Sequence, residues 1–221
     1  GMENLNGKVA VVTGGARDIG KAISMSLAKA GAKVVVNYFN SELYGKETVL
    51  EIEKTGGTAV AIYADVTKQV DVDAMVKTTL DHFGPKIDIL VNVAGGLFAR
   101  KSIEEMDEDF YNLVMDVNLK SVFLVTKTIK PHMEKGGAII NFASQAGRDG
   151  GGPGAAIYAA SKGAVITYTR ALAKEFGPQG VRVNALCPGM IATKFHDDFT
   201  KDEVREKVAG STPLRREGEA D

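Results

Sequence analysis

Apolar residues along the chain fall into short continuous runs that alternate with longer segments in which they recur every three or four positions. The short runs predict buried strands at 8–13, 32–37, 58–64, 87–92, 138–143 and 180–186. The periodic segments predict helices at 21–30, 43–54, 70–82, 108–134 and 155–176. Such regular alternation predicts an α/β fold with a doubly wound parallel sheet that carries helices on both faces.

Glycines follow the first predicted strand directly. Residues 13–20 read Thr-Gly-Gly-Ala-Arg-Asp-Ile-Gly, and a helical pattern begins at Lys21 and ends before Gly31. Glycine permits a tight turn, and the start of a helix offers free N–H groups and a favourable dipole to a pyrophosphate. The placement therefore indicates a dinucleotide-binding turn in a Rossmann-type sheet.

The second predicted strand ends in Asn37, where an NAD-binding unit usually has Asp or Glu for the ribose hydroxyls. Without that carboxylate a 2′-phosphate is not repelled, and Arg17 in the glycine turn could pair with it. These two residues favour NADP(H) over NAD(H) as the cofactor. From the residues alone, Arg17 as a solvated side chain is an equally good interpretation.

Candidate proton-transfer groups lie further along the chain. Ser144 follows a predicted strand, and Tyr158 and Lys162 are four residues apart, so they share one face of a predicted helix. A phenol has a pKa near ~10, and a neighbouring ammonium lowers it by favouring the phenolate. With a serine to hold a carbonyl or alcohol oxygen, the set suits proton transfer. The alternatives are a solvated helix face and a flexible Gly-Pro connector at 150–154.

Composition narrows the function class. The 221 residues suit a single domain over 1–221, and a formal charge of −1 predicts no nucleic-acid partner. No apolar run is long enough to cross a bilayer, so no membrane partner is expected. One cysteine, Cys187, suggests a reducing compartment, hence the cytoplasm. His82, His132 and His196 lack ligand spacing, so no metal is expected.

Together these motifs resemble the short-chain dehydrogenase/reductase family over nearly the whole chain. The resemblance rests on Thr13-Gly14 through Ile19-Gly20, Asp65-Val66, Asn92–Gly95, Asn118, Ser144, Tyr158–Lys162 and Pro188-Gly189, in the family's order and approximate spacing. Among its members the chain is most similar to 3-oxoacyl-(acyl-carrier-protein) reductases, through Val34–Tyr38 and Ala185–Gly189.

The resemblance implies catalytic roles. Tyr158 would donate a proton to a carbonyl oxygen while nicotinamide supplies hydride, and Ser144 would orient that carbonyl. Lys162 would hold the nicotinamide ribose and lower the pKa of Tyr158. Asn118 would position a water in the proton relay; its alternative role is that of a helix-interior Asn bonded to a neighbouring backbone.

The resemblance also implies an extended cofactor site at the carboxyl ends of the strands. Its residues would be Gly14, Arg17, Ile19 and Gly20 at the pyrophosphate side, Asp65 and Val66 at the adenine, Asn92 and Gly95 near the ribose, and Pro188, Gly189, Ile191 and Thr193 at the nicotinamide. Asp65 could also be a turn cap, and Pro188-Gly189 a plain strand exit.

Three features depart from the family pattern. Asp18 stands where the family usually has glycine; it could cap the following helix, but its carboxylate would repel a pyrophosphate unless it points away. Val93 replaces the second asparagine of the Asn-Asn-Ala-Gly motif. Family members continue beyond the equivalent of residues 218–221 into a helix and an edge strand. Either the chain is truncated or the protein lacks that edge strand, and we expect truncation.

The expected substrate is a 3-oxoacyl thioester, with an acyl carrier protein as a candidate partner. Helix residues that could meet an acidic carrier are Lys120, Lys127, Lys130, Lys135, Arg170 and Lys174, although solvated faces explain them as well. Alternatives are a sugar, polyol or other secondary-alcohol dehydrogenase, and a non-catalytic NADP(H) sensor or scaffold. Segment 192–211 resembles the family's substrate lid, and relatives predict a homotetramer.

Overall fold

The computed structural model describes residues 4–188 and 194–209. Within these ranges six strands form one parallel sheet in the order β3-β2-β1-β4-β5-β6. Their bounds are Val9–Thr13 (β1), Lys33–Tyr38 (β2), Thr58–Tyr63 (β3), Ile89–Asn92 (β4), Ala138–Phe142 (β5) and Arg182–Leu186 (β6). The order reverses between β1 and β4, so a crevice opens there at the carboxyl ends of the strands, where sheets of this type bind ligands.

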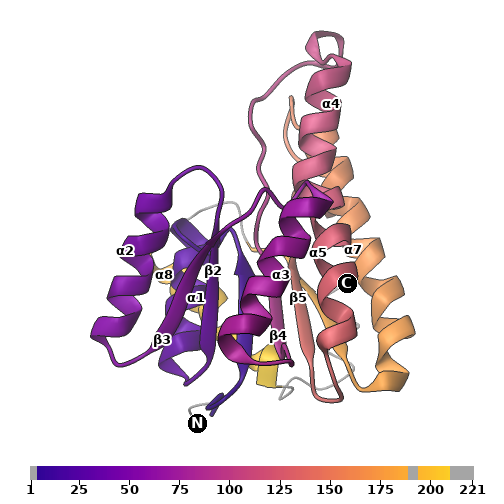
Figure 1. Ribbon diagram of the computed structural model, residues 1–221. Helices are drawn as coiled ribbons and strands as arrows, with labels where there is room; N and C mark the ends of the chain where they lie inside the picture. Colours follow the sequence, from indigo (N-terminus) through magenta and orange to yellow (C-terminus); the bar gives the residue numbers. More distant parts are fainter. Residues whose placement is uncertain (1–3, 189–193, 210–221) are drawn as a thin grey trace.

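Helices cover both faces of the sheet (Figure 1), which confirms the predicted doubly wound fold. One face carries α1 (Asp18–Lys29), α2 (Glu42–Lys54) and α8 (Lys194–Ala209); the other carries α3 (Gln69–Phe83), α5 (Ser121–Ile129) and α7 (Ala156–Phe176). The shorter elements are η1 (Ile103–Glu105), α4 (Glu108–Met115), η2 (Asp116–Lys120), η3 (Lys130–His132), α6 (Ala146–Asp149) and η4 (Gly177–Gln179).

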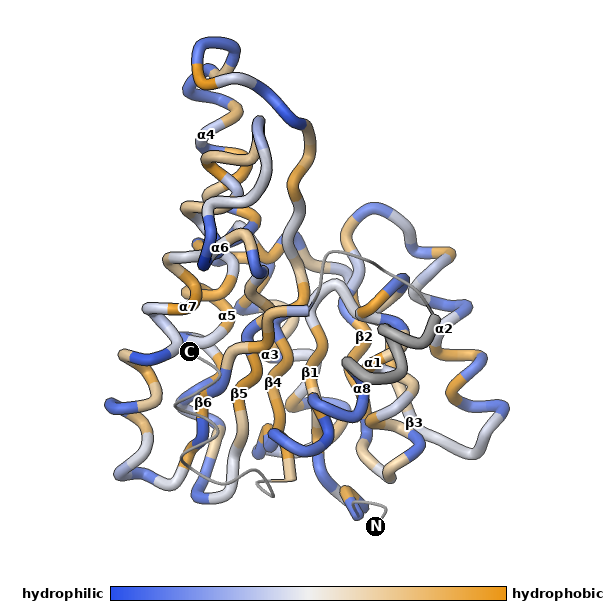
Figure 2. Tube along the Cα trace, turned by 180° about the vertical axis from the view of Figure 1, so that it is seen from behind, coloured by the Kyte–Doolittle hydropathy of each residue, from blue (hydrophilic) through white to orange (hydrophobic). Residues whose placement is uncertain are grey.

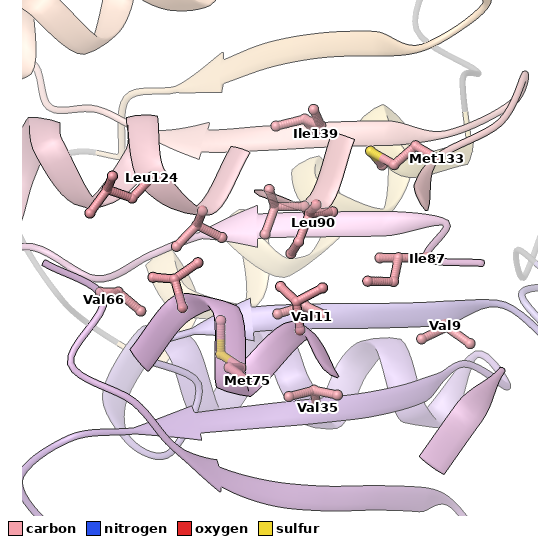
Figure 3. Close-up of a cluster of buried hydrophobic side chains, with 14 of the residues drawn as sticks. Val9, Val11, Val35, Val66, Met75, Ile87, Leu90, Leu124, Met133 and Ile139 are labelled. Carbon is pink, nitrogen blue, oxygen red and sulfur yellow. The ribbon is translucent and has the colours of Figure 1, made fainter. Parts of the chain in front are cut away.

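The strands read as continuous apolar runs because both of their faces are buried. Successive side chains of β1 point to opposite sides, so Val9 and Val11 pack toward α3 and α5, while Ala10 and Val12 pack toward α1. In Figure 3, Leu90 and Ile139 of the neighbouring strands extend the first of these layers. Figure 2 shows the result at the scale of the chain: apolar strands inside, with polar positions along the outer helices.

The helix predicted at 108–134 is present from Glu108 to Ile129, but it contains a π-helical turn. It is divided into α4, a π-helical turn (η2) and α5, and the amide of Ser121 donates to the carbonyl of Asp116 across the π turn. A single inserted residue of this kind leaves the apolar periodicity nearly intact, so the pattern alone does not reveal it. The α-helix also ends earlier than predicted, because a 3₁₀ turn follows at Lys130–His132 and Pro131 within it has no N–H to continue α5.

Helix α8 lies on the α1 side of the sheet. Val204 and Val208 belong to the core there, and the guanidinium of Arg182 donates to the carbonyls of Lys207 and Val208, both at 2.6 Å. These bonds satisfy carbonyls at the end of the helix that have no intrahelical donor. Among the described residues, no helix has the length and apolar character needed to cross a membrane.

Candidate active site

The turn after β1 is closed so tightly that only glycine fits at two of its positions. Gly14 has a φ of +61°, and a Cβ on Gly20 would stand 1.8 Å from the carbonyl oxygen of Gly14. The turn leads into α1, where Arg17 occupies the N-cap position and no side chain caps the first N–H groups. A helix start of this kind can bind an anion through its backbone amides.

Asn37 holds this turn from behind. Its side chain is buried; its Oδ1 accepts from the Gly14 N–H at 3.0 Å, and its carbonyl accepts from the Gly15 N–H at 3.0 Å. Its Nδ2 donates to the carbonyls of Ile62 and Ala64 at the end of β3. The structure therefore places the Asn37 side chain between strands, in contact with the turn rather than along a pocket wall.

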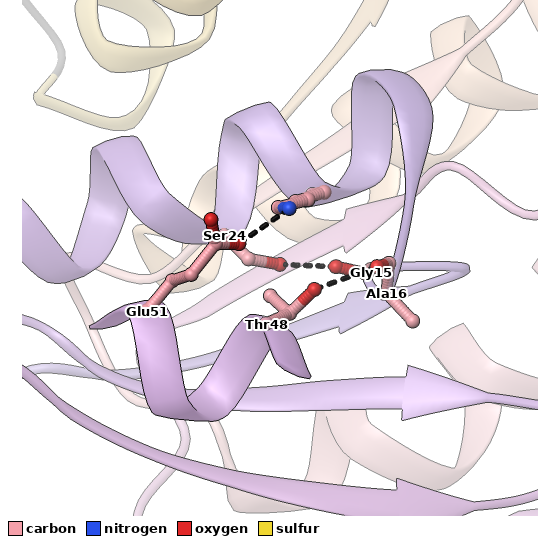
Figure 4. Close-up of polar contacts among 6 residues, drawn as sticks. Gly15, Ala16, Ser24, Thr48 and Glu51 are labelled. Atoms are coloured by element: carbon pink, nitrogen blue, oxygen red, sulfur yellow. Dashed lines mark hydrogen bonds and ion pairs between the residues drawn. The ribbon is translucent and has the colours of Figure 1, made fainter. Parts of the chain in front are cut away.

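Helices α1 and α2 are both tied to the glycine turn (Figure 4). The hydroxyl of Ser24 in α1 donates to the carbonyl of Gly15 at 3.0 Å, and that of Thr48 in α2 donates to the carbonyl of Ala16 at 2.6 Å. An ion pair between Lys21 and Glu51 joins the two helices further along. The turn is thus fixed relative to α2 as well as to its own helix.

An open pocket of about 350 Å³ lies in front of this turn. Five predicted cofactor residues line it, namely Gly14, Arg17, Ile19, Gly20 and Gly95. The other wall of the pocket was not predicted from the sequence. This wall consists of residues from the end of β2 to the first turn of α2, namely Tyr38, Phe39, Asn40, Ser41 and Tyr44. Their position directly after a strand that ends at the same edge was the available signal.

Arg17 and Asp18 differ in how they enter the pocket. The guanidinium carbon of Arg17 lies 5.2 Å from the centre of the Tyr44 ring, a cation–π contact. Asp18 has a φ of +55°, which lies in the left-handed region that favours glycine. Asp18 lines the same pocket. The positive φ gives a physical reason for the glycine that the family usually has at this position.

Lys162 is the most deeply buried of the predicted catalytic residues that can carry a charge. It is 4% exposed, and its Nζ donates to the carbonyl of Phe142 at 2.9 Å. A Cβ on Gly95 would stand 3.0 Å from this Nζ and 2.6 Å from Oδ1 of Asn118, so both polar atoms converge on the loop after β4. Burial lowers the pKa of the Lys162 ammonium to about 8, although the charge of Cys187 opposes this shift.

Asn118 lies in the π turn and clamps that loop. Its Nδ2 donates to the carbonyls of Gly96 (2.8 Å) and Val114 (2.9 Å), and its Oδ1 accepts from the Gly96 N–H (3.0 Å). The alternative anticipated from the sequence, an Asn bonded to nearby backbone, is therefore present. π turns occur often at functional sites, and this one places Asn118 against the Gly95 loop.

Ser144 and Tyr158 belong to two segments in close contact. Ser144 follows β5 and is buried, and its Oγ accepts from the Ala146 N–H at 3.1 Å. Tyr158 lies half-buried in the first turn of α7. A Cβ on Gly147 in α6 would stand 2.7 Å from the carbonyl carbon of Lys162, so the absence of a side chain there brings the Ser144 segment against the helix that carries Tyr158 and Lys162.

Three predicted cofactor residues point their side chains elsewhere. The carboxylate of Asp65 accepts from the N–H and the hydroxyl of Thr67, at 3.0 and 2.6 Å, as a turn cap. Val66 belongs to the core beside α3, as Figure 3 shows. The amide of Asn92 donates to Asn141 at 2.9 Å inside the sheet.

The remaining predicted residues follow β6 in the sequence. Pro188 is half-buried there, whereas Gly189, Ile191 and Thr193 lie outside the described residues. Sequence reasoning gave no structural role to Thr13, whose Oγ1 accepts from the N–H groups of Val93 (3.0 Å) and Ala94 (3.2 Å). This hydroxyl joins the ends of β1 and β4 across the crevice.

Comparison with known proteins places this geometry in a family. A family model described as enoyl-(acyl carrier protein) reductase matches residues 14–221. A 3-oxoacyl-[acyl-carrier-protein] reductase of Synechocystis is 43% identical over 99% of this chain and 86% of its own length. A hydroxynaphthalene reductase-like protein of Metarhizium robertsii is 42% identical over 96% and 84%.

Solved structures agree. A short-chain dehydrogenase of Burkholderia cenocepacia in complex with NADP has a TM-score of 0.84 and 34% identity, covering 94% of this chain and 91% of that one. An NADH-dependent reductase complexed with NAD has a TM-score of 0.81 and 35% identity, covering 86% of this chain and 81% of that one. The chain belongs to the short-chain dehydrogenase/reductase family and is an oxidoreductase that uses a nicotinamide cofactor.

Proposed function

We propose that this oxidoreductase uses NADPH to reduce the ketone of a 3-oxoacyl thioester, with Tyr158 as the proton donor. The observation that carries the proposal is the placement of Lys162. Its buried amine lies one helical turn after Tyr158, meets Asn118 at the Gly95 loop, and belongs to the helix against which the Ser144 segment packs.

The chain's own groups suit proton transfer to an oxygen. With a pKa of about 8, Lys162 is mostly protonated at neutral pH, and its positive charge favours the phenolate of Tyr158 that forms when the proton leaves. Ser144 would donate a hydrogen bond to the substrate oxygen and stabilise its developing charge. The nicotinamide, when bound, supplies the hydride.

The glycine turn fits the pyrophosphate of such a cofactor, because it combines an uncapped helix start with glycines that allow a close approach of backbone. Preference for NADP(H) is supported by Arg17 in the pocket wall and by Asn37 in place of a carboxylate at the end of β2. In this arrangement Asn37 would contribute indirectly, by holding the glycine turn in position through its hydrogen bonds to Gly14 and Gly15.

The substrate proposal draws on the Synechocystis relative, whose name specifies 3-oxoacyl-[acyl-carrier-protein]. The Metarhizium robertsii relative supports a second candidate, the reduction of a hydroxynaphthalene-type ketone. For the first candidate we also propose that an acidic carrier protein binds at the lysines near α5. We further propose that the protein forms a homotetramer and is located in the cytoplasm. Of these lysines, Lys130 already contacts Gln179 at 2.7 Å and the Phe176 ring at 4.8 Å.

The test is an initial-rate assay with NADPH and NADH against an acetoacetyl thioester, a bicyclic aromatic ketone, sugars and polyols. We expect the thioester with NADPH to be the best pair. Tyr158→Phe should still bind NADPH, as measured by the fluorescence of the nucleotide. The same variant should lose most of its turnover. The control is Tyr168→Phe on the same helix, whose ring packs against the core and which should retain its rate.

Near-normal turnover in Tyr158→Phe would reject this residue as the acid. A preference for the aromatic ketone, or for sugars and polyols, would replace the thioester proposal. Tight NADPH binding without oxidation by any member of the panel would support a nucleotide-binding sensor instead.

A further inference from the structure

Arg17 presents its guanidinium to the pocket while resting on an aromatic ring. The guanidinium carbon lies 5.2 Å from the centre of the Tyr44 ring, and both residues line the pocket in front of the glycine turn. Among the described residues Arg17 makes no ion pair. A cation–π contact occupies no ordinary hydrogen-bond acceptor, so N–H donors of the guanidinium stay available to a ligand.

Tyr44 is itself held in place by the start of α2. Its N–H donates to the Oγ of Ser41, the N-cap of this helix, at 3.2 Å. The next residue, Gly45, lies so close to Tyr38 that a Cβ would stand 2.7 Å from that ring. The first turn of α2 therefore packs directly on the end of β2, and only a glycine at position 45 allows it.

The separation between Arg17 and Tyr44 is fixed from a second direction. The hydroxyl of Thr48, one turn after Tyr44, donates at 2.6 Å to the carbonyl of Ala16, the residue before Arg17 (Figure 4). Glu42, a carboxylate in the same first turn, is engaged by Lys46 at 2.7 Å. The backbone that carries the Tyr44 ring is thus fixed relative to the backbone at Arg17, and the carboxylate of Glu42 is already paired with Lys46.

We propose that Tyr44 is a positioning residue that holds Arg17 over the pocket to bind the 2′-phosphate of NADP(H). A free arginine side chain loses rotamer entropy when a ligand orders it, and a side chain already held on a ring loses less. The inference rests on the proposed cofactor preference and deepens it, because it makes selectivity depend on the Arg17–Tyr44 pair and not on Arg17 alone.

The experiment measures binding rather than turnover. The probes are 2′,5′-ADP and 5′-AMP, which differ by the phosphate in question, and their affinities are compared by calorimetry. We expect Tyr44→Ala to weaken 2′,5′-ADP roughly 3- to 10-fold and to leave 5′-AMP unchanged. Tyr44→Phe keeps the ring and should bind both probes normally. Tyr111→Ala removes an exposed aromatic residue of α4, outside the pocket, and serves as the control.

A double-mutant cycle separates positioning from direct contact. In an Arg17→Ala background, Tyr44→Ala should cause no further loss of 2′,5′-ADP affinity. An equal further loss would show that the ring touches the ligand itself, and weakening of both probes by Tyr44→Ala would show a structural role; either result overturns the inference. If Arg17→Ala does not weaken 2′,5′-ADP relative to 5′-AMP, the proposed cofactor preference fails. If it does while Tyr44→Ala has no effect, only the role of Tyr44 fails.

Discussion

At the scale of single residues, two ionisable groups sit in unusual surroundings. Lys162 is buried with its amine on a backbone carbonyl, and burial lowers its pKa to about 8. Asp18 adopts a left-handed backbone conformation at the start of α1, on the wall of the cofactor pocket. Burial of an amine and a positive φ at a non-glycine residue each cost stability, and such costs are typical of functional sites.

Lys162 should make stability depend on pH. Its folded-state pKa lies below the ordinary value of 10.5, so between about pH 8 and 10.5 the unfolded chain holds a proton that the folded chain has released. Stability rises with pH wherever the unfolded state binds more protons. Without cofactor, the free energy of unfolding of the wild type should therefore rise relative to that of Lys162→Met as pH rises through this window. The expected increase is on the order of 3 kcal/mol.

Urea unfolding at several pH values checks this expectation. Lys174→Met, on an exposed position of the same helix, should follow the wild type throughout. Parallel curves for the wild type and Lys162→Met from pH 8 to 10.5 would show that the amine does not titrate there.

Asp18 should weaken the cofactor through its charge. Asp18→Asn keeps a residue that tolerates positive φ but removes the carboxylate, so NADPH should bind a few-fold more tightly, with a smaller gain at high salt because ions screen the repulsion. Asp18→Gly should bind with similar strength, since it also lacks the charge. Fluorescence titration measures both. Unchanged affinity in Asp18→Asn would mean that the carboxylate points away from the bound anion.

At the scale of elements, the site depends on close approaches that only small residues permit. The π turn between α4 and α5 brings Asn118 against the Gly95 loop, and Gly147 lets α6 touch the backbone of α7. A second contact joins the loop after β4 to the start of α7, where the Lys101 N–H donates to the carbonyl of Gly154 at 3.1 Å. In Figure 1, α4 extends beyond the carboxyl ends of the strands on this side of the molecule.

Gly147→Ala should separate α6 from α7. Its Cβ would stand 2.7 Å from backbone atoms of α7, so one segment must move, at an expected cost of about 1–3 kcal/mol in the free energy of unfolding. Because Ser144 would shift relative to Tyr158, kcat should fall roughly 10- to 100-fold. Gly177→Ala is the matched control, since its Cβ meets no atom within 4 Å and its φ is helical. Normal turnover in Gly147→Ala would contradict the argument.

At the scale of the whole molecule, buried hydrogen bonds join the two halves of the sheet beside the crevice. Thr13 in β1 accepts from two amides after β4, and Asn92 in β4 donates to Asn141 in β5, which donates in turn to Thr169 in α7 at 3.0 Å. These bonds run from the switch point to the helix that carries the candidate acid. They connect the pocket at the glycine turn to the candidate proton-transfer residues through one network of buried hydrogen bonds.

Thr13→Val tests this network. Valine matches threonine in shape but cannot accept the two N–H groups, so the free energy of unfolding should fall by about 1–3 kcal/mol and NADPH should bind more weakly. Thr58→Val, at an exposed position of β3, should change neither quantity. Urea unfolding and fluorescence titration measure the two effects, and a Thr13→Val protein as stable as the wild type would show that water replaces the hydroxyl.

Much of the architecture could be predicted from the apolar pattern. All six strands of the described sheet correspond to predicted runs, because a strand buried on both faces needs a continuous apolar segment. Strand ends also predicted which motifs share an edge. The direction of individual side chains was not predictable: Asn37, Asp65 and Asn92 stand at that edge, yet their side chains bond to neighbouring backbone or to the core. A polar residue at the end of a strand can therefore stabilise the fold or bind a ligand, and its position in the sequence does not tell which.

Order along the chain was enough to establish the alternation of strands and helices, the glycine turn, and the Tyr158–Lys162 spacing, because each depends on residues close in sequence. The burial of Lys162, the π turn at Asn118 and the support of Arg17 by Tyr44 depend on contacts between residues far apart in the chain. Such contacts follow from how the elements pack, and packing depends on the shapes of many side chains at once.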